Sequence, residues 1–352
     1  MALFSRKADP VLGIDISSTA VKLIELRQGS GRYRVESYAA EPLPQNAVVE
    51  KNIANLEAVS ECIRAALRRS HTKLREAAVA VPSSSAISKV IAVQSGLSED
   101  EMEAQVTLQA NQYIPYPLEE VNLDFQVMGP SRGRADETDV LLVASRSENV
   151  EVRVDALQSA GVTARVVDVE SYAVENAFGL MGPDMQGGEE QTVGVVDVGA
   201  TMTTLTVIEQ GRILYTREQV FGGRQLTDEV MRRYDYSYEE AGRRKRAGDL
   251  PESYEQEVLV PFLDMLAQQV MRSLQFFYGA SQHNSVDHVL LAGGCAVIPG
   301  AVDTVREQVG VPVTVANPFA NMSVASRVHP QALAEDAPSL LIATGLATRS
   351  FD

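Results

Sequence analysis

One short pattern centred on an aspartate occurs twice in this chain, and it constrains the fold more than any other feature. In each copy an apolar run ends at the aspartate, Asp15 or Asp197, and a threonine follows four residues later. A second apolar run comes next, and a Gln-Gly pair stands thirteen residues after each aspartate. A single aspartate before a turn carries little information, but two copies in register indicate an internal duplication. Each copy predicts a strand, a tight turn and a second strand.

The turns between these paired strands are predicted to bind phosphate. Small and hydroxyl side chains leave backbone N–H groups free to point at an anion, and the aspartate beside them can hold a metal ion, often through water. Two facing copies would grip a polyphosphate from both sides. The turn residues concerned are Ser17, Ser18, Thr19, Gly199, Ala200 and Thr201.

Composition narrows the class of protein. The 352 residues suffice for two cored domains, and a hydrophobic fraction of 45% indicates a globular chain. A net charge of −16 argues against a general nucleic-acid binder, and no apolar run is long enough to span a membrane. The first residues lack the apolar stretch of a secretory signal, and Cys62 and Cys295 read as free buried thiols. We therefore expect a cytoplasmic protein that reaches a membrane only through partners.

The periodicity of apolar residues predicts an α/β chain that contains an inserted block. A three-stranded meander over 11–40 comes first, and the second half restarts a meander at Thr192. Between them a strand, a helix with a capping box at 98–101, two strands and a further helix read as a small α+β subdomain. Glycines and a proline over 182–188 mark the linker between the halves. The last helix, 339–348, is too apolar to lie exposed and must pack back on a domain.

The expected parts are a first half, an inserted subdomain, a second half and a helical subdomain within the second half. Their predicted limits are 1–85 with 164–187 for the first half, 86–163 for the insert, 188–226 with 286–352 for the second half, and 227–285 for the helical subdomain. Helices are predicted to fill 227–242 and 252–279. The basic run 243–246 reads as a solvated helix face, or as a contact for an acidic partner or a nucleotide.

Five motifs in a fixed order resemble the actin/Hsp70/sugar-kinase superfamily. The two aspartate turns resemble its two phosphate loops, and 290–300 resembles its adenosine loop. The segments 170–173 and 343–347 resemble its two connecting helices. An α+β insert in place of a helical lid is similar to the branch of the cell-division protein FtsA.

A closer resemblance covers essentially the whole chain. The segments 12–19, 112–120, 197–204 and 221–227 resemble the PilM family of type IV pilus assembly proteins. This implies an actin-like two-domain ATPase fold with an FtsA-type α+β inserted subdomain. It also implies an ATP-binding scaffold at the inner face of the inner membrane. The implied partner is the N-terminal cytoplasmic tail of PilN, docked in a groove between the first half and the insert. The pilus assembly ATPases and the platform protein PilC are implied as further contacts.

The same resemblance implies ATP and Mg²⁺ as ligands and gives the site residues their roles. Asp15 and Asp197 would hold Mg²⁺ through its waters, and Lys22 either reaches phosphate or is an outward-facing strand lysine. Glu170 would orient the attacking water, but the residues after it depart from the Glu-Pro-Thr pattern of efficient hydrolases, so we expect slow turnover. The remaining contacts are expected at Gly199, Thr201, Gly222 and Gly223 around the phosphates and ribose, and at Gly293, Gly294, Cys295, Ile298 and Lys245 around the adenosine.

The segment that contains Tyr113, Ile114, Tyr116 and Leu118 has two interpretations. It is a rigid turn that packs the core of the insert, or it is one wall of a peptide groove. Its prolines fix the backbone and its tyrosines supply amphipathic contact area, which suits a peptide partner.

Two other classes of function are alternatives. A small-molecule kinase of the same superfamily would need a catalytic aspartate beyond the nucleotide acids, and no such residue stands out. A filament-forming protein like FtsA would carry a C-terminal amphipathic anchor, which this sequence is not expected to have.

Overall fold

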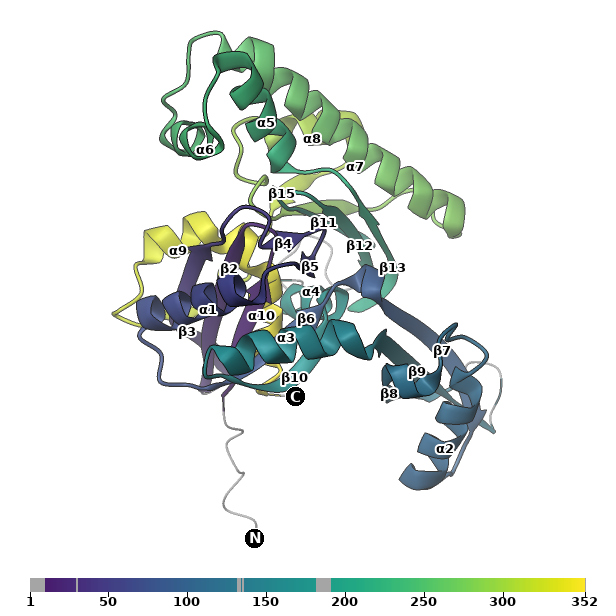
Figure 1. The fold of residues 1–352 in the computed structure, drawn as a ribbon. Helices are drawn as coiled ribbons and strands as arrows, with labels where there is room; N and C mark the ends of the chain where they lie inside the picture. The colour runs from purple at the N-terminus through teal and green to yellow at the C-terminus, as the bar shows by residue number, and fades with distance from the viewer. Residues whose placement is uncertain (1–9, 30, 132–133, 135, 182–190, 352) are drawn as a thin grey trace.

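Two sheets carry most of the fold (Figure 1). The computed structural model describes residues 10–29, 31–131, 134, 136–181 and 191–351. The first sheet contains β1 (Leu12–Ile16), β2 (Ala20–Gly29), β3 (Arg32–Pro42), β6 (Glu76–Val81), β10 (Thr163–Val169) and β16 (Ser323–Val324). The second contains β11 (Val193–Val198), β12 (Thr203–Glu209), β13 (Arg212–Gln219), β14 (His288–Ala292) and β15 (Val313–Val315).

Both sheets follow one plan. An antiparallel meander begins each of them, as β1-β2-β3 and as β11-β12-β13. A later strand then lies parallel to the first strand of the meander, β6 beside β1 and β14 beside β11. A further parallel strand follows, β10 beside β6 and β15 beside β14. This repeated order is the duplication that the two aspartate turns predict.

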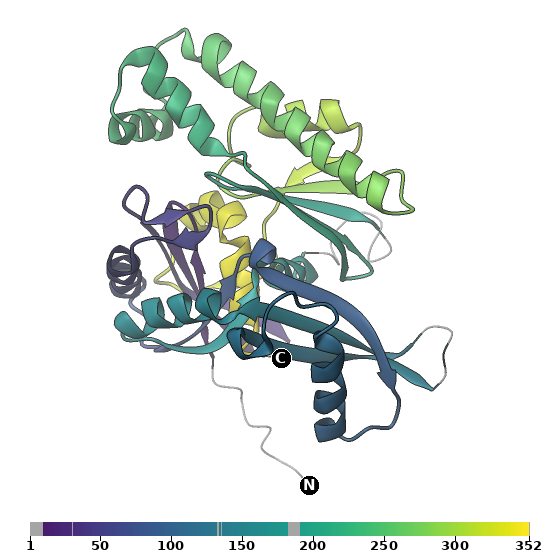
Figure 2. The same cartoon turned by 45° about the vertical axis from the view of Figure 1, so that its right-hand side comes forward.

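A third, three-stranded sheet projects from the first half, as Figure 2 shows. It is built from β7 (Ala86–Gln94), β8 (Val121–Pro130) and β9 (Glu137–Arg146), in the order β7-β9-β8. One face packs on α2 (Glu99–Ala110), where Ile91, Val106 and Leu142 are buried together. The capping box predicted at the start of α2 is present, because Ser98 and Glu101 exchange hydrogen bonds with each other's backbone N–H.

Helices cover both faces of the two main sheets. On one face of the first sheet lie α1 (Leu56–Ser70) and α3 (Ser147–Ser159), whose apolar side chains share a core with β1 and β2. Between the two halves lie α4 (Glu170–Gly179) and α10 (Leu341–Thr348). The second half adds α5 (Gly223–Tyr234), α6 (Tyr238–Ala247), α7 (Val260–Ala280) and α8 (Ala301–Val309). The helix α9 (Pro330–Asp336) packs on the first sheet, where Leu333 shares a core with Ile24 and Val35. No helix in the described ranges is long and apolar enough to cross a bilayer.

The last helix packs back on the fold, as predicted, and it does so through glycine. A Cβ at Gly345 would collide with the carbonyl oxygen of Ala173 on α4, and a Cβ at Gly13 would collide with that of Ala343 on α10. The backbones of β1, α10 and α4 therefore touch directly. This stack of small residues joins the two halves.

The helix predicted over 227–242 is wrong, because the chain breaks there into α5 and α6. Asp235 ends α5 in a left-handed conformation with φ 55°, and the Ser237 side chain caps α6 by accepting from Glu240 N–H. The second predicted helix, 252–279, corresponds to α7 and the π-helical turn Glu255–Leu259 before it.

The position of α3 bears on the limits of the insert. The predicted insert, 86–163, includes α3, but the buried Ala156 and Leu157 of α3 pack with Leu12 and Ile63 of the first half. By packing, therefore, the insert consists of β7, α2, β8 and β9. The predicted linker, 182–188, lies outside the described residues.

Candidate nucleotide site between the halves

The two aspartate turns meet tip to tip. Asp15 lies near the end of β1 and Asp197 near the end of β11, and both stand beside a turn that leads into the next strand. The hydroxyl of Ser18 in the first turn lies 2.9 Å from the hydroxyl of Thr201 in the second. The structure thus brings together the two tips that the duplicated pattern places on opposite sides of a polyphosphate.

Lys22 belongs to this site and does not face outward. It pairs with Asp15 across the β1–β2 ladder, and its ammonium group donates to Asp15 Oδ2 at 3.0 Å. The lysine side chain is 15% exposed and that of the aspartate 5%. The Lys22 pKa is raised: burial lowers it, but the attraction of Asp15 and Asp197 outweighs burial.

Close backbone approach explains the glycines of the second half. Gly223 N–H donates to Gly199 C=O at 3.0 Å and Arg224 N–H to Ala200 C=O at 2.8 Å, so the start of α5 is tied to the second tip. A Cβ at Gly222 would lie 2.5 Å from Gly199 O. Gly293 has φ 82° and passes so near the Asp197 carboxylate that only glycine fits. Through glycine, these loops place backbone atoms directly against the Asp197 carboxylate and its turn, with no side chain between them.

The residues expected around the adenosine belong to the second half. Lys245 on α6 donates to Thr227 Oγ1 at 2.7 Å, and burial lowers its pKa. Cys295 is buried beside Gly223, and burial raises the pKa of its thiol to about 11. Ile298 packs against the core of the second half, and Gly294 has open space where a side chain would be. The thiol is therefore a packing group and not a nucleophile.

Sequence reasoning missed one cation, Lys51. It sits at the tip of the short hairpin between β4 (Val48–Val49) and β5 (Asn52–Ile53). Its ammonium group donates to Glu170 Oε2 at 2.5 Å, to Glu218 Oε1 at 2.9 Å and to Thr204 Oγ1 at 3.2 Å. Glu170 belongs to α4, whereas Thr204 and Glu218 belong to β12 and β13. One side chain therefore joins the two halves.

The turn that presents Lys51 is conformationally unfavourable. Glu50 and Lys51 are its two central residues, with φ 48° and 65°. Such turns usually carry Asn-Gly, and a left-handed conformation costs other residues about 1–2 kcal/mol each. Arg153, which is 3% exposed, supports the turn by donating to the Lys51 carbonyl at 2.9 Å. Strain held in place in this way marks functional sites more often than ordinary loops.

Carboxylates outnumber lysines where the halves meet. The group consists of the acids Asp15, Glu170, Asp197 and Glu218 and the lysines Lys22 and Lys51. Burial raises the pKa of Glu170 and of Asp197, although the nearby lysines lower both. Mg²⁺ prefers carboxylate and water oxygens, so an excess of buried carboxylates fits this ion. Asp15 and Asp197 are the residues that would hold it.

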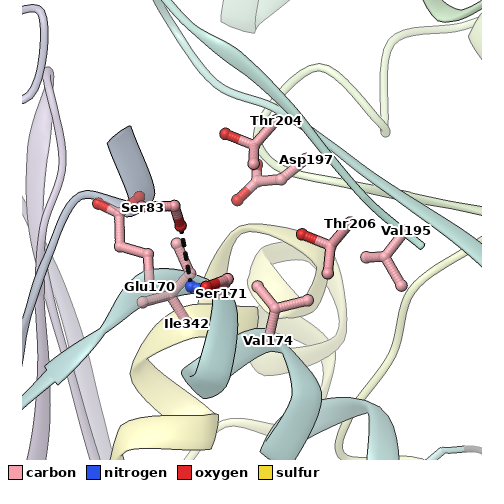
Figure 3. Close-up of a pocket in the computed structure, with 9 residues that line it drawn as sticks. All are labelled: Ser83, Glu170, Ser171, Val174, Val195, Asp197, Thr204, Thr206 and Ile342. Carbon is pink, nitrogen blue, oxygen red and sulfur yellow. Dashed lines mark hydrogen bonds between the residues drawn. The ribbon is translucent and has the colours of Figure 1, made fainter. Parts of the chain in front are cut away.

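A small cavity lies between the halves just below this group. Figure 3 shows Asp197 and Thr204 projecting toward it from the second half, opposite Ser83 and Glu170 of the first. Ser83 Oγ accepts from the backbone N–H of Ser171 at the start of α4, at 3.1 Å. The polar residues of both halves therefore converge on one point.

The whole chain matches one family. A family model described as "Type IV pilus assembly protein PilM" matches residues 13–351. The chain belongs to the PilM family. Among solved structures, a PilM-PilN type IV pilus biogenesis complex is similar with a TM-score of 0.81 and 26% identity, over 98% of this chain and 99% of that one. The resemblance that the sequence motifs indicate is thereby confirmed.

More distant relatives support the fold. MreB5 of Spiroplasma citri bound to ADP is similar with a TM-score of 0.50 and 14% identity, over 98% of this chain and 97% of that one. The protein EutJ of Escherichia coli K12, named for ethanolamine utilization, is 25% identical over 157 residues, 45% of this chain and 49% of EutJ. The chain thus spans about half the length of the curated relatives it matches. Together with the PilM match, these findings confirm the predicted actin-like two-domain α/β fold, while the FtsA type of the insert stays a prediction.

A large groove separates the insert from the two halves. Its walls are the face of the β7-β9-β8 sheet that α2 leaves open, the helix α4, and the edge strand β13. Val90 and Leu141 line it on the insert, Tyr172 on α4, and Leu214 and Glu218 on β13. The groove is therefore partly apolar and partly charged, and it borders both halves.

The proline segment of the insert lies beside this groove but does not line it. Ile114 is 5% exposed and packs in the insert core, and Leu118 packs against the same core. Tyr113 and Tyr116 are exposed, with Lys89 over one ring and Arg146 over the other. Lys89 also lines the groove, so Tyr113 borders its rim. Packing thus accounts for the aliphatic residues and leaves the tyrosines available.

Proposed function

We propose that this chain is an ATP-binding scaffold of the type IV pilus inner-membrane assembly. The observation that carries the proposal is the meeting of the two aspartate turns, with the hydroxyls of Ser18 and Thr201 2.9 Å apart, in a chain of the PilM family. Two such tips supply N–H and hydroxyl donors to phosphates, and Asp15 and Asp197 supply anchors for the waters of Mg²⁺. When bound, Mg²⁺ would neutralise the phosphate charge.

The proposed partner is the N-terminal cytoplasmic tail of PilN. The similar solved structure is a PilM-PilN complex, and its likeness extends over 98% of this chain. The groove between the insert and the halves offers open apolar side chains and an edge strand to an extended peptide. The exposed Tyr113 and Tyr116 are proposed as contacts at its rim. This partner would hold the chain at the inner face of the inner membrane, where the assembly ATPases and PilC are proposed further contacts.

Mg-ATP binding tests the site. In calorimetry of the full chain, Asp15→Ala and Asp197→Ala should each weaken Mg-ATP binding by about tenfold or more, because each removes an anchor for the metal's waters. Asp264→Ala on the exposed side of α7 is the matched control and should bind like the unaltered chain. Unchanged affinity in both site variants would refute the assignment.

Hydrolysis is proposed to be slow without partners. The residues that follow Glu170, Ser171 and Tyr172, depart from the Glu-Pro-Thr pattern of efficient hydrolases, so we do not expect this acid to orient water well. Purified chain should turn over less than about one ATP per second, the lower end of ordinary enzymes. Faster turnover that disappears in Glu170→Gln would favour an enzyme over a scaffold.

A further inference from the structure

We propose that Lys51 binds the terminal phosphate of a nucleoside triphosphate, and that this contact changes the wall of the groove. This inference rests on the proposed function, since it requires nucleotide between the two aspartate turns. In the arrangement described above, Lys51 binds Glu170 and Glu218. A terminal phosphate would draw the ammonium group away from Glu218 and so alter the groove wall that β13 provides.

The place of Lys51 fits a phosphate ligand. Thr204, which accepts from its ammonium group at 3.2 Å, lies directly opposite Asp197 in the β11–β12 ladder. The charges of Lys51 and Lys22 both lower the pKa of Asp197, so this carboxylate feels both ammonium groups. Lys22 is bound to Asp15 of the first turn. A polyphosphate held between the turns would thus meet Lys22 of the β1–β2 pair on one side. On the other side it would meet Lys51 of the β4–β5 hairpin, which contacts Thr204 of β12.

The length of the phosphate chain decides which nucleotide moves Lys51. A terminal phosphate brings more negative charge than either carboxylate, and lysine is a common phosphate ligand. A diphosphate ends one phosphate short, so it leaves the ammonium group on Glu170 and Glu218. The backbone of the turn stays fixed meanwhile, because Arg153 holds the Lys51 carbonyl and also donates to Ala80 O at 2.8 Å. The response is therefore confined to the lysine side chain and its acidic partners.

Glu218 connects the site to the groove. It lies on β13, and its side chain lines the groove while Oε1 accepts from Lys51. Its other oxygen, Oε2, is buried without a hydrogen-bond partner. When Lys51 leaves, this carboxylate loses its cation and has to turn toward solvent in the groove or toward a bound peptide. The Glu218 side chain therefore links the nucleotide site directly to the groove.

The experiment compares Mg-ATP with Mg-ADP in Lys51→Met, which keeps the length of the side chain and removes its charge. Calorimetry on the full chain would measure both nucleotides, and then a peptide of the PilN N-terminal tail in the presence of each. We expect the unaltered chain to prefer Mg-ATP by about tenfold and to bind the peptide differently in the two states. Lys51→Met should lose both differences while its Mg-ADP affinity stays within about twofold. Lys73→Met, an exposed lysine after α1, is the control.

If Lys51→Met does not fold, Glu218→Gln keeps the test informative. This variant weakens the ion pair that holds Lys51 by removing the charge of the acidic partner. We expect this variant to bind Mg-ATP more tightly and to lose the nucleotide dependence of peptide binding. Variants that keep both the ATP preference and the nucleotide dependence of the unaltered chain overturn the role of Lys51. Failure of the unaltered chain to bind Mg-ATP overturns the proposed function itself, and the inference with it.

Discussion

At Asp197, burial and neighbouring charges act in opposite directions on one carboxyl group. Burial raises its pKa, Lys22 and Lys51 lower it, and Asp15 and Glu218 raise it again. The net effect is a raised pKa, so an ionised Asp197 costs stability when no cation is bound. A bound divalent cation would remove this cost, so the cost favours cation binding by the folded chain.

The stability of the nucleotide-free chain should therefore depend on Asp197 in a pH-dependent way. A carboxyl whose folded pKa is raised supports folding at low pH, and this support is lost as pH rises from its ordinary value of about 4 through the raised folded value. Asp197→Asn should accordingly change little at pH 4 and raise the melting temperature by about 2–4 °C at pH 8. Thermal unfolding without nucleotide or Mg²⁺ checks this, and a variant that melts lower at pH 8 would contradict it.

Local patterns predict the residues of the aspartate turns but not Lys51. Asp15 and Asp197 stand in a repeated motif, and Gly222 and Gly293 stand in glycine loops next to predicted elements. Lys51 has no such motif, since a Glu-Lys pair is not a typical two-residue hairpin turn. Its role comes from contacts with α4, β12 and β13, which lie far along the chain. Only the assembled fold brings these groups together.

Among the elements, the crossing of α4 and α10 is highly sensitive to side-chain size. A Cβ at Gly345 would collide with backbone atoms of Ala173, and backbone cannot move aside as a flexible side chain can. Gly345→Ala should destabilise the chain by about 3 kcal/mol or more, measured by urea unfolding. Gly179→Ala at the end of α4, where a Cβ meets nothing, should be neutral or slightly stabilising. Equal stabilities of the two variants would disprove the close contact.

Element boundaries follow from the sequence where capping signals are read. The start of α2 was predictable from its capping box, and the break between α5 and α6 carries a similar signal, since Ser237 precedes Glu240 by three residues. The helix predicted over 227–242 passes over that signal. The packing of α3 has no local signal, because its apolar face suits either the insert or the first half.

On the scale of the whole molecule, the insert, α4 and β13 enclose a groove that no single element forms. Val90 on the open face of β7 is 48% exposed and lines it, whereas Leu108 on α2 is 72% exposed on the other side of the insert. Val90→Glu should weaken binding of the PilN tail peptide by about tenfold, or 1.4 kcal/mol, without changing Mg-ATP binding. Leu108→Glu is the matched control. Fluorescence of a Trp-labelled peptide can report binding without background, because the chain contains no Trp.

Tyr116→Ala examines the rim of the same groove. Loss of the exposed ring should weaken binding of the peptide and spare Mg-ATP binding, because Tyr116 lies on the insert surface, with Arg146 over its ring. If Leu108→Glu weakens the peptide and Val90→Glu does not, the peptide binds on the α2 side of the insert instead.

The hydrogen bond between Ser18 and Thr201 has a consequence for the speed of nucleotide entry. Phosphate cannot pass between two tips that touch, so the halves have to part before a nucleotide is seated. Binding then includes a step whose rate does not depend on nucleotide concentration. In a stopped-flow experiment the observed association rate would level off as ATP is raised. Ser18→Ala, which removes one partner of the contact, would raise that plateau.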